Sequence, residues 1–278
     1  MRSTMHMLAA EDTAWLLPLF DASLVADSRR RLAHFGLDTR AQNRALTTMR
    51  KALESDGYLG RGELVDRLGT VGIEIDAPRR VHLFRLATGT GLAILGPDHG
   101  AQTLLALRTE WVGGARKHDR DAALRELARR YFSAFAPATE ADFAGWSGLA
   151  LRDVRAGIGA IAGELDEVTV AGARAWVPKR GARRARRGVV RLLPAWDNYL
   201  MGHRDRDFIA GPDRWPRLMP GGGLIRPTVL VDGVAVGTWG MRRKKGAVEL
   251  EVSPFAALDA DVEEAIREEV EDIRRFEG

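Results

Sequence analysis

Two short clusters of basic residues are the parts of this sequence whose composition points most directly to chemistry. The first lies in a loop rich in glycine and alanine, within a stretch from 168 to 196 that has eight basic residues and no acid. Guanidinium groups bind phosphate oxygens through planar, paired hydrogen bonds. A solvated charge run without a ligand is the alternative. We predict phosphate contact for this cluster, which comprises Arg183, Arg184, Arg186 and Arg187.

The second cluster occupies the predicted tip of a β-hairpin. Four consecutive positive charges repel one another, so a purely structural purpose is hard to assign to them. Simple solubility is the alternative. We predict that the tip clamps the backbone of a nucleic acid or enters one of its grooves. The cluster comprises Arg242, Arg243, Lys244 and Lys245.

A third group, around His203, could perform acid–base chemistry. Histidine titrates near neutral pH, and Asp197 and Asp205 are close to it in sequence. Alternating arginine and aspartate over 204–207 is more typical of an ion-pair network that locks a loop. We therefore prefer a structural role for His203 and assign no catalytic residue.

Other kinds of site are excluded or lack support in the sequence. The chain contains no cysteine, which excludes disulfides, thiolate catalysis and zinc sites built on cysteine. The histidines have no metal-ligand spacing, and we predict no metal site. A phosphate-binding loop, a dinucleotide fingerprint and a nucleophile elbow are all missing from the sequence.

The overall charge is compatible with an anionic partner. The 278 residues carry a formal net charge of +4, and the sequence pI is about 9.7. A basic protein tends toward nucleic acids or anionic surfaces, although pI alone is weak evidence. No apolar run is long enough to cross a bilayer, and no secretion signal is recognisable. We expect a cytoplasmic protein that does not bind membranes.

The elements that must position these residues follow a pattern that occurs twice. In the first copy, helices are predicted over 41–54, 63–68 and 78–87, followed by short apolar strands over 92–95 and 103–107. Three helices and a two-stranded hairpin are the winged-helix arrangement, a variant of the helix-turn-helix. Generic α-hairpins with connecting strands are the alternative.

The second copy has the same order. Helices are predicted over 119–135, from a Thr139 cap to Trp146, and over 151–165. A hairpin formed by 168–170 and 174–177 follows them. Two copies at matching spacing strengthen the winged-helix interpretation.

The third helix of each copy carries arginines that could face a DNA groove. They are Arg79, Arg80 and Arg85 in the first copy, and Arg152 and Arg155 in the second. In tandem arrays some of these helices are buried against neighbours, so both possibilities remain open. The tryptophans are expected to be core anchors; base stacking would require an exposed ring.

The ends of the chain differ from the repeated middle. A short strand and an amphipathic helix are predicted over 5–20. In the last third, Asp232-Gly233 is a strong signal for a tight hairpin turn. Strands are predicted there over 189–193, 228–231, 234–239 and 248–252, and helices over 199–208 and 258–276.

We therefore predict an α+β protein with tandem winged-helix modules, a small antiparallel β-rich segment and a C-terminal helix. The predicted domains are a remnant of an upstream module with a linker helix over 1–40, modules over 41–115 and 116–180, and the β-rich segment over 181–278.

Several stretches also match known motifs in order along the chain. Residues 192–206 (LLPAWDNYLMGHRDR) match the pattern LLPxxDxYLxGxRDR, and 131–149 resemble RYLxxxGPATxxDFAxWSGL, with alanine at 136 in place of glycine. Residues 227–239 and 252–255 match PTVLVDGxxxGTW and VxPF, and 2–6 are similar to RGTLH. In these motifs the chain resembles a bacterial winged-helix superfamily that includes the azinomycin-resistance and interstrand-crosslink DNA glycosylases.

This resemblance implies winged helices that embrace double-stranded DNA, with a basic β-hairpin near the duplex. It implies excision of alkylated or crosslinked bases by a monofunctional mechanism in the enzymes of the family. It implies no metal or organic cofactor. We expect the protein to be a monomer.

One departure from the family pattern affects the expected activity. The family enzymes place a Gln-x-Gln or Gln-x-Asp motif upstream of the RGTLH element, where this sequence starts. The only glutamines here are Gln42 and Gln102, which are far apart. We expect an N-terminally shortened DNA-binding member without base excision, unless the start site is misplaced. The alternatives are an active glycosylase that uses Asp197 or His203, and a winged-helix transcription regulator.

Overall fold

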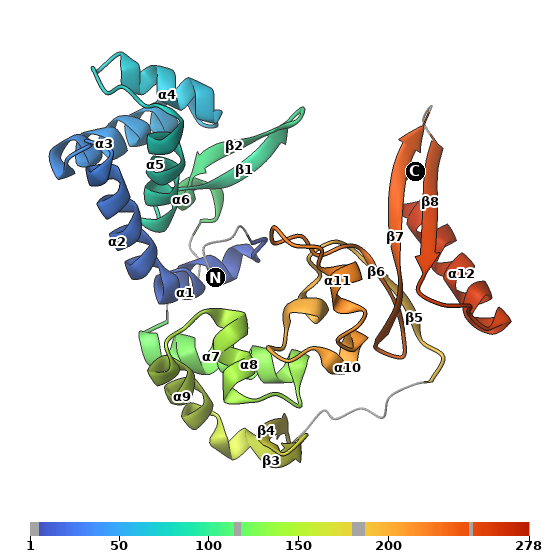
Figure 1. Ribbon diagram of the computed structural model, residues 1–278. Coiled ribbons are helices and arrows are strands. Elements are labelled where there is room, and N and C mark those ends of the chain that lie inside the picture. Colours follow the sequence, from blue (N-terminus) through green and yellow to red (C-terminus); the bar gives the residue numbers. More distant parts are fainter. Residues whose placement is uncertain (1–5, 114–117, 180–186, 245–246, 278) are drawn as a thin grey trace. The chain divides into compact units, whose positions relative to one another are not determined.

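A computed structural model describes residues 6–113, 118–179, 187–244 and 247–277, without the side chains of Lys244 and Ala247. It combines helices with small antiparallel sheets, as expected for an α+β protein (Figure 1). The chain forms two compact units, residues 1–127 and 128–278. Each unit is described separately below.

The first unit is mainly helical. The helix that precedes the first repeat is α2 (Pro18–His34). It begins with a proline, which costs no backbone hydrogen bond in the first turn of a helix. The elements in order are η1 (Ala10–Asp12), α1 (Thr13–Leu16), α2, α3 (Thr39–Asp56), α4 (Arg61–Gly69), α5 (Ala77–Gly89), β1 (Ala93–His99), β2 (Gln102–Leu107) and α6 (Arg108–Trp111).

Helices α3, α4 and α5 and the β1–β2 hairpin form the first repeat. Aspartates cap two of the helices: Asp38 accepts a hydrogen bond from the amide of Ala41 (2.7 Å) at α3, and Asp76 from that of Arg79 (3.0 Å) at α5. Leu59, between α3 and α4, exchanges two backbone hydrogen bonds with Leu105 of β2. This isolated bridge joins the segment between α3 and α4 to the hairpin.

The core of this repeat is aliphatic. Leu53, Leu64 and Leu83, from the three helices, are fully buried together. Helix α2 lies along α5 (Figure 1). The approach is close, because a Cβ atom added at Gly89 of α5 would lie 3.1 Å from the side chain of Leu24 on α2.

Helix α7 (Arg120–Phe135) begins in the first unit and continues into the second. The elements that follow it are α8 (Glu140–Ser147), α9 (Leu151–Ala160), η2 (Ala162–Glu164), β3 (Leu165–Val170), β4 (Ala173–Pro178), β5 (Val190–Leu193), η3 (Asn198–Met201), α10 (Asp207–Ala210), α11 (Trp215–Leu218), β6 (Thr228–Val231), β7 (Val234–Lys244), β8 (Ala247–Pro254) and α12 (Ala260–Glu277).

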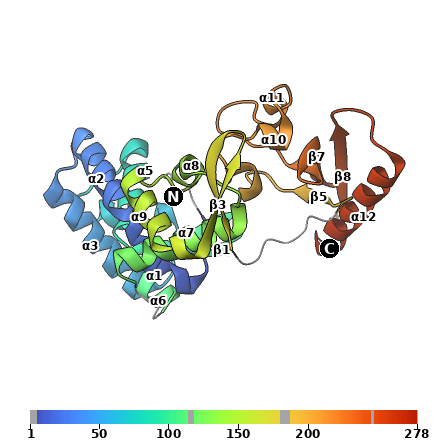
Figure 2. The ribbon, with the colours of Figure 1, turned by 90° about the horizontal axis from the view of Figure 1, so that it is seen from below.

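The second repeat consists of α7, α8, α9 and the β3–β4 hairpin (Figures 1 and 2). Ala138, between α7 and α8, exchanges two backbone hydrogen bonds with Trp176 of β4, as Leu59 does with Leu105 in the first repeat. Thr139 and Asp142 form a complete capping box at α8. The two repeats therefore share the order of their elements and the bridge that joins helices to hairpin.

The last part of the chain is a four-stranded antiparallel sheet in the order β5-β6-β7-β8. Alternate side chains of β6 enter two cores: Leu230 packs with Leu218 of α11, and Val229 packs with Ile266 of α12. In both ribbon views α12 lies beside the sheet (Figures 1 and 2). Asp232 and Gly233 turn β6 into β7 with positive φ angles of 50° and 84°.

Several predicted elements differ from the structure. The third helix of the second repeat ends at Ala160, because the following Leu165–Val170 segment pairs with β4. The helix predicted over 199–208 is two short pieces, η3 and α10, separated at 202–206. Residues 6–9, the described part of the predicted first strand, form no strand.

Candidate nucleic-acid interface

The structure describes part of the predicted DNA-contact set. Arg183, Arg184, Arg186 and Lys245 lie outside the described residues, as does the side chain of Lys244. Arg187, Arg242 and Arg243 are exposed. Arg187 lies near Asp232, where its positive charge contributes to lowering the pKa of that carboxyl, after hydrogen bonds from the Val189 and Gly188 amides.

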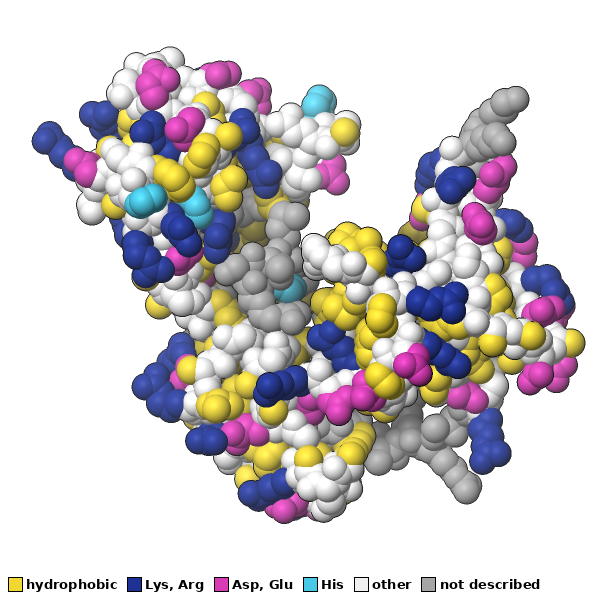
Figure 3. All heavy atoms as spheres, in the orientation of Figure 1, with side chains coloured by type: hydrophobic (Ala, Val, Ile, Leu, Met, Phe, Trp, Pro, Cys, Tyr) yellow, Lys and Arg dark blue, Asp and Glu magenta, His cyan; other side chains and the backbone are white. Residues whose placement is uncertain are grey.

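The basic hairpin differs from the expected cluster of cations at a tip. Arg242 and Arg243 belong to strand β7, opposite Glu249 and Val248 of β8. The guanidinium of Arg243 binds the carboxylate of Glu277 in α12. On the face shown in Figure 3, basic and acidic side chains lie next to each other around this hairpin and α12. Part of the positive charge is therefore neutralised by the chain itself.

The arginines of α5 in the first repeat mostly make structural contacts. Arg79 donates to the carbonyl oxygens of Phe35 (2.8 Å) and Glu74 (3.2 Å). Arg85 lies 4.0 Å from the carboxylate of Asp27 on α2. Arg80 is exposed. Because α2 packs along α5, the exposed side chains of this third helix are confined to its start, at Ala77, Pro78, Arg80 and Val81.

Helix α9 of the second repeat has an open face. Val154 and Ile158 are buried in the repeat, whereas Leu151, Arg152 and Arg155 are exposed on the other side. The side chain of Arg152 is 87% exposed, with a contact to Asp153 of 3.6 Å. Arg155 donates to Glu140 at 2.9 Å, and this hydrogen bond raises the pKa of the guanidinium.

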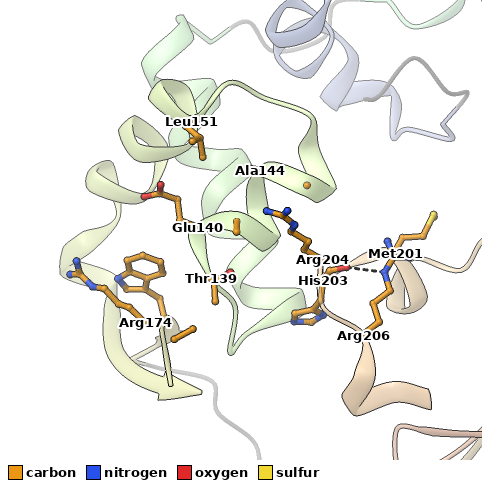
Figure 4. A pocket seen from close by; sticks show the side chains of 13 residues that line it. Thr139, Glu140, Ala144, Leu151, Arg174, Met201, His203, Arg204 and Arg206 are labelled. Atoms are coloured by element: carbon orange, nitrogen blue, oxygen red, sulfur yellow. Dashed lines mark hydrogen bonds between the residues drawn. The ribbon is translucent and has the colours of Figure 1, made fainter. Parts of the chain in front are cut away.

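An open pocket of about 1010 Å³ lies beside α9. Its walls come from the first turns of α8, the start of α9, strand β4 and the loop before α10. Figure 4 shows Arg204 extending across the pocket between Glu140 and Ala144. The lining residues are Thr139, Glu140, Ala141, Ala144, Gly145, Leu151, Ala173, Arg174, Trp176, Met201, His203, Arg204 and Arg206.

The loop at 202–206 is fixed to the second repeat by three hydrogen bonds. Tyr131 donates its hydroxyl to the carbonyl of Gly202 (2.7 Å), and the Arg204 amide donates to Asp142 Oδ1 (2.8 Å). The third joins His203 Nε2 to the carbonyl of Phe135 (2.8 Å). Burial raises the pKa of the Tyr131 hydroxyl, which therefore stays protonated as a donor.

Among the described residues, His203 and Asp197 make their side-chain hydrogen bonds to the backbone. His203 Nε2 faces a carbonyl oxygen, and its Nδ1 is buried without a hydrogen-bond partner among the described residues. A histidine base normally has a carboxylate that orients its ring. Asp197 accepts from the amide of Tyr199 (2.8 Å) as the cap of η3. Asp205 accepts from the Asp207 amide (3.0 Å), so hydrogen bonds to the backbone hold this loop.

A second pocket contains a carboxylate that sequence reasoning missed. Asp21, in the first turns of α2, lines a cavity of about 300 Å³ with Arg108 and His118. Desolvation by burial raises the pKa of Asp21 to about 6, against the opposing charge of Arg108. Asp21 is the one carboxylate in the apolar run LLPLFDASL, and this isolated position could have identified it as a buried acid from the sequence.

Two other kinds of site have no support in the described residues. Within them, no group of three or more potential ligands could hold a metal ion. None of the helices that the structure describes is both long and apolar enough to cross a membrane.

Comparison with known proteins identifies the family. The chain is 26% identical over 295 residues to an interstrand DNA cross-link repair glycosylase of Streptomyces sahachiroi, covering all of this chain and 78% of the relative. The solved structure of the Streptomyces sahachiroi DNA glycosylase AlkZ matches with a TM-score of 0.78 at 25% identity, again over all of this chain and 78% of that one. The model of the AlkZ-like DNA glycosylase family matches residues 1–276. The chain therefore belongs to the AlkZ-like DNA glycosylase family.

Proposed function

We propose that this protein is a DNA-binding relative of the glycosylases that repair alkylated or crosslinked DNA, and that it binds double-stranded DNA through winged-helix modules. The open face of α9 next to the β3–β4 hairpin is the observation that carries the proposal. In winged-helix proteins the third helix enters the major groove and the hairpin contacts the neighbouring backbone. In this assignment the repeats over 41–115 and 116–180 are the modules, and α9 is the helix that contacts DNA.

Arginines at three places would supply the charge for this contact. Arg152 and Arg155 lie on α9, Arg242 is exposed on β7, and Arg187 lies at the described end of the basic loop. Contacts of this kind hold a protein on the duplex without reading its sequence. We keep the basic loop with Arg183, Arg184 and Arg186, and the hairpin with Lys244 and Lys245, in the proposed interface.

We propose that base excision by a glutamine pair is not part of this activity. The 278 residues contain no Gln-x-Gln or Gln-x-Asp motif. Gln42 is buried, and its amide donates to the carbonyls of Arg29 (3.1 Å) and Leu37 (2.8 Å). Gln102 lies on the β1–β2 hairpin of the same repeat. Neither glutamine is placed to form a pair that orients water at a sugar carbon.

A salt titration tests the binding. Fluorescence anisotropy with a labelled duplex of mixed sequence should give an affinity that falls steeply with salt, with a slope of about −0.9 per phosphate contact in a logarithmic plot. Arg152→Ala should lower the affinity and reduce the slope by about one contact. Arg267→Ala, an exposed arginine of α12 paired with Glu264, is the matched control and should change neither. Affinity that is independent of salt would reject the proposal.

One observation favours a second candidate, an active glycosylase. The carboxyl of Asp21 has a pKa of about 6 and lines a cavity with Arg108 and His118. A carboxylate with a pKa close to the working pH is suited to act as a general base. Incubating the protein with N7-alkylated duplex and then cleaving at abasic sites would test this role. Abasic product that disappears with Asp21→Asn would support it, and no product above the blank would exclude it.

A further inference from the structure

We propose that the pocket beside α9 binds one nucleotide that has left the base stack of the bound DNA. This inference rests on the proposed function, because the nucleotide belongs to the duplex that α9 contacts. The pocket opens between Leu151, at the start of α9, and Ala173 and Trp176 of β4. These are the elements that the proposed function places on DNA.

The apolar part of the pocket suits a base. Ala141, Ala144, Leu151, Trp176 and Met201 contribute apolar surface to its lining. The volume of about 1010 Å³ is at the upper end of the range for pockets that bind small molecules. A base removed from its stack exposes two flat apolar faces, so an apolar pocket of this size can shelter it.

One wall offers a stacking surface. The guanidinium of Arg174 lies over the indole of Trp176, 5.2 Å from the ring centroid. Arg174 is held there by the carboxylate of Glu167 (2.5 Å). Proteins that bind unstacked bases place them on aromatic rings and on guanidinium planes. The guanidinium of Arg174, backed by the indole of Trp176, presents such a plane to the pocket.

Arg204 provides the positive charge that a phosphate would need. Its amide is fixed by Asp142, so the start of the side chain has a set position. Its side chain is exposed, forms no ion pair with the described residues and extends across the pocket (Figure 4). The other charges in the lining are engaged: Glu140 pairs with Arg155, and Arg206 donates to the carbonyl of His203. An apolar pocket with one available cation matches a base linked to a phosphate.

Two duplexes that differ by one unpaired nucleotide test the inference. The first is fully paired, and the second carries a single bulged 2-aminopurine, whose fluorescence reports stacking. We expect the wild-type protein to bind the bulged duplex about tenfold more tightly, in line with the usual contribution of one stacked base. We also expect the 2-aminopurine emission to change on binding.

A third duplex separates the base from the flexibility of the DNA. A bulge bends easily, and flexible DNA can bind more tightly for that reason alone. A bulge with an abasic residue keeps the flexibility and removes the base. We expect the tenfold preference to disappear with this duplex. If the abasic bulge binds as tightly as the bulged base, the inference is wrong.

Two variants assign the effect to the pocket. Arg204→Ala should remove the preference for the bulged duplex and leave affinity for the paired duplex within about twofold. Arg152→Ala, on the outer face of α9, should weaken both duplexes by the same factor. Equal wild-type affinity for the bulged and paired duplexes, or equal losses with Arg204→Ala, would overturn the inference alone. Failure to bind any duplex would overturn the proposed function as well.

Discussion

The two repeats have the same order of helices and strands, but their third helices have different surroundings. In the first repeat α5 is covered by α2, and in the second repeat the outer face of α9 is exposed. The covered helix carries three arginines, Arg79, Arg80 and Arg85, and the exposed helix carries only two. The number of basic residues on a helix therefore does not indicate which helix has a free face; the packing of its neighbours does.

In the second repeat, the loop at 202–206 packs against Phe135 of α7 at Gly202. A Cβ atom there would lie 2.3 Å from a ring carbon of Phe135, a distance that real Cβ atoms do not adopt. Gly202→Ala should therefore destabilise the protein by about 3 kcal/mol, through strain in packed surroundings. Gly145→Ala is the control, because its added Cβ would lie 3.8 Å from Arg204. Urea unfolding measures both, and equal stabilities would contradict the tight contact.

A matched pair of glycines tests the difference between the two helices directly. Gly89 lies in the last turn of α5 against Leu24, and Gly159 lies in the last turn of α9 with nothing within 4 Å of an added Cβ. Gly89→Leu should destabilise the protein by about 2 kcal/mol, because the added side chain separates α5 from α2.

Gly159→Leu should change stability by less than about 1 kcal/mol, since it replaces a glycine on an exposed helix. It should nevertheless weaken DNA binding, because leucine adds bulk on the face proposed to enter the groove. Thermal unfolding and anisotropy separate the two effects. A Gly159→Leu variant with undiminished affinity would remove α9 from the interface.

Charge reversal compares the two helices by affinity. Arg152→Glu on α9 should lower duplex affinity about tenfold, because it replaces one phosphate contact with a repulsion. Arg80→Glu is the matched change on α5, where the arginine is also exposed but the helix is covered by α2. It should change affinity less than threefold, by roughly half a kcal/mol. Equal losses would show that both helices contact DNA.

The covering helix α2 has a titratable group of its own. The pKa of Asp21 is raised from 3.8 to about 6, so the native state favours the protonated carboxyl. Below pH 4 the Asp21 carboxyl is protonated and its contribution to the free energy of unfolding is fully present. This contribution is lost as the pH rises through 6. Asp21→Asn should therefore stabilise the protein relative to wild type by about 1 kcal/mol at pH 7.5, allowing for partial exposure. The difference should vanish near pH 4. Urea unfolding at both pH values would measure it, and a constant difference would contradict the shift.

Sequence periodicity predicted most of the secondary structure. The alternation in 228–231 and the Asp232-Gly233 signal located the β6–β7 turn, because short-range chemistry determines such turns. The end of α9 at Ala160 was missed, since pairing with β4 converts the next residues into strand β3. The bridges of Leu59 and Ala138 were also beyond the sequence, because a single pair of backbone hydrogen bonds leaves no periodic pattern.

The candidate site was harder to predict, because contacts between residues far apart in the sequence also leave no periodic pattern. The motif around His203 indicated a locked loop, and the structure places that loop against α8 and the end of α7. The pocket that it lines with α8, α9 and β4 combines residues from Thr139 to Arg206, up to 67 positions apart, which no local pattern relates. Similarly, the ion pair of Arg243 with Glu277 joins residues whose separation of 34 hides their contact.

Asp142 serves two parts of the second repeat with one carboxylate. Its Oδ2 accepts from the amide and hydroxyl of Thr139, which caps α8, and its Oδ1 accepts from the amide of Arg204. Asparagine could supply only one acceptor oxygen, and glutamate would shift both acceptors by a bond length. Among related sequences, positions 139 and 142 should consequently vary together. A substitution at either position should be accompanied by changes in the loop at 202–206.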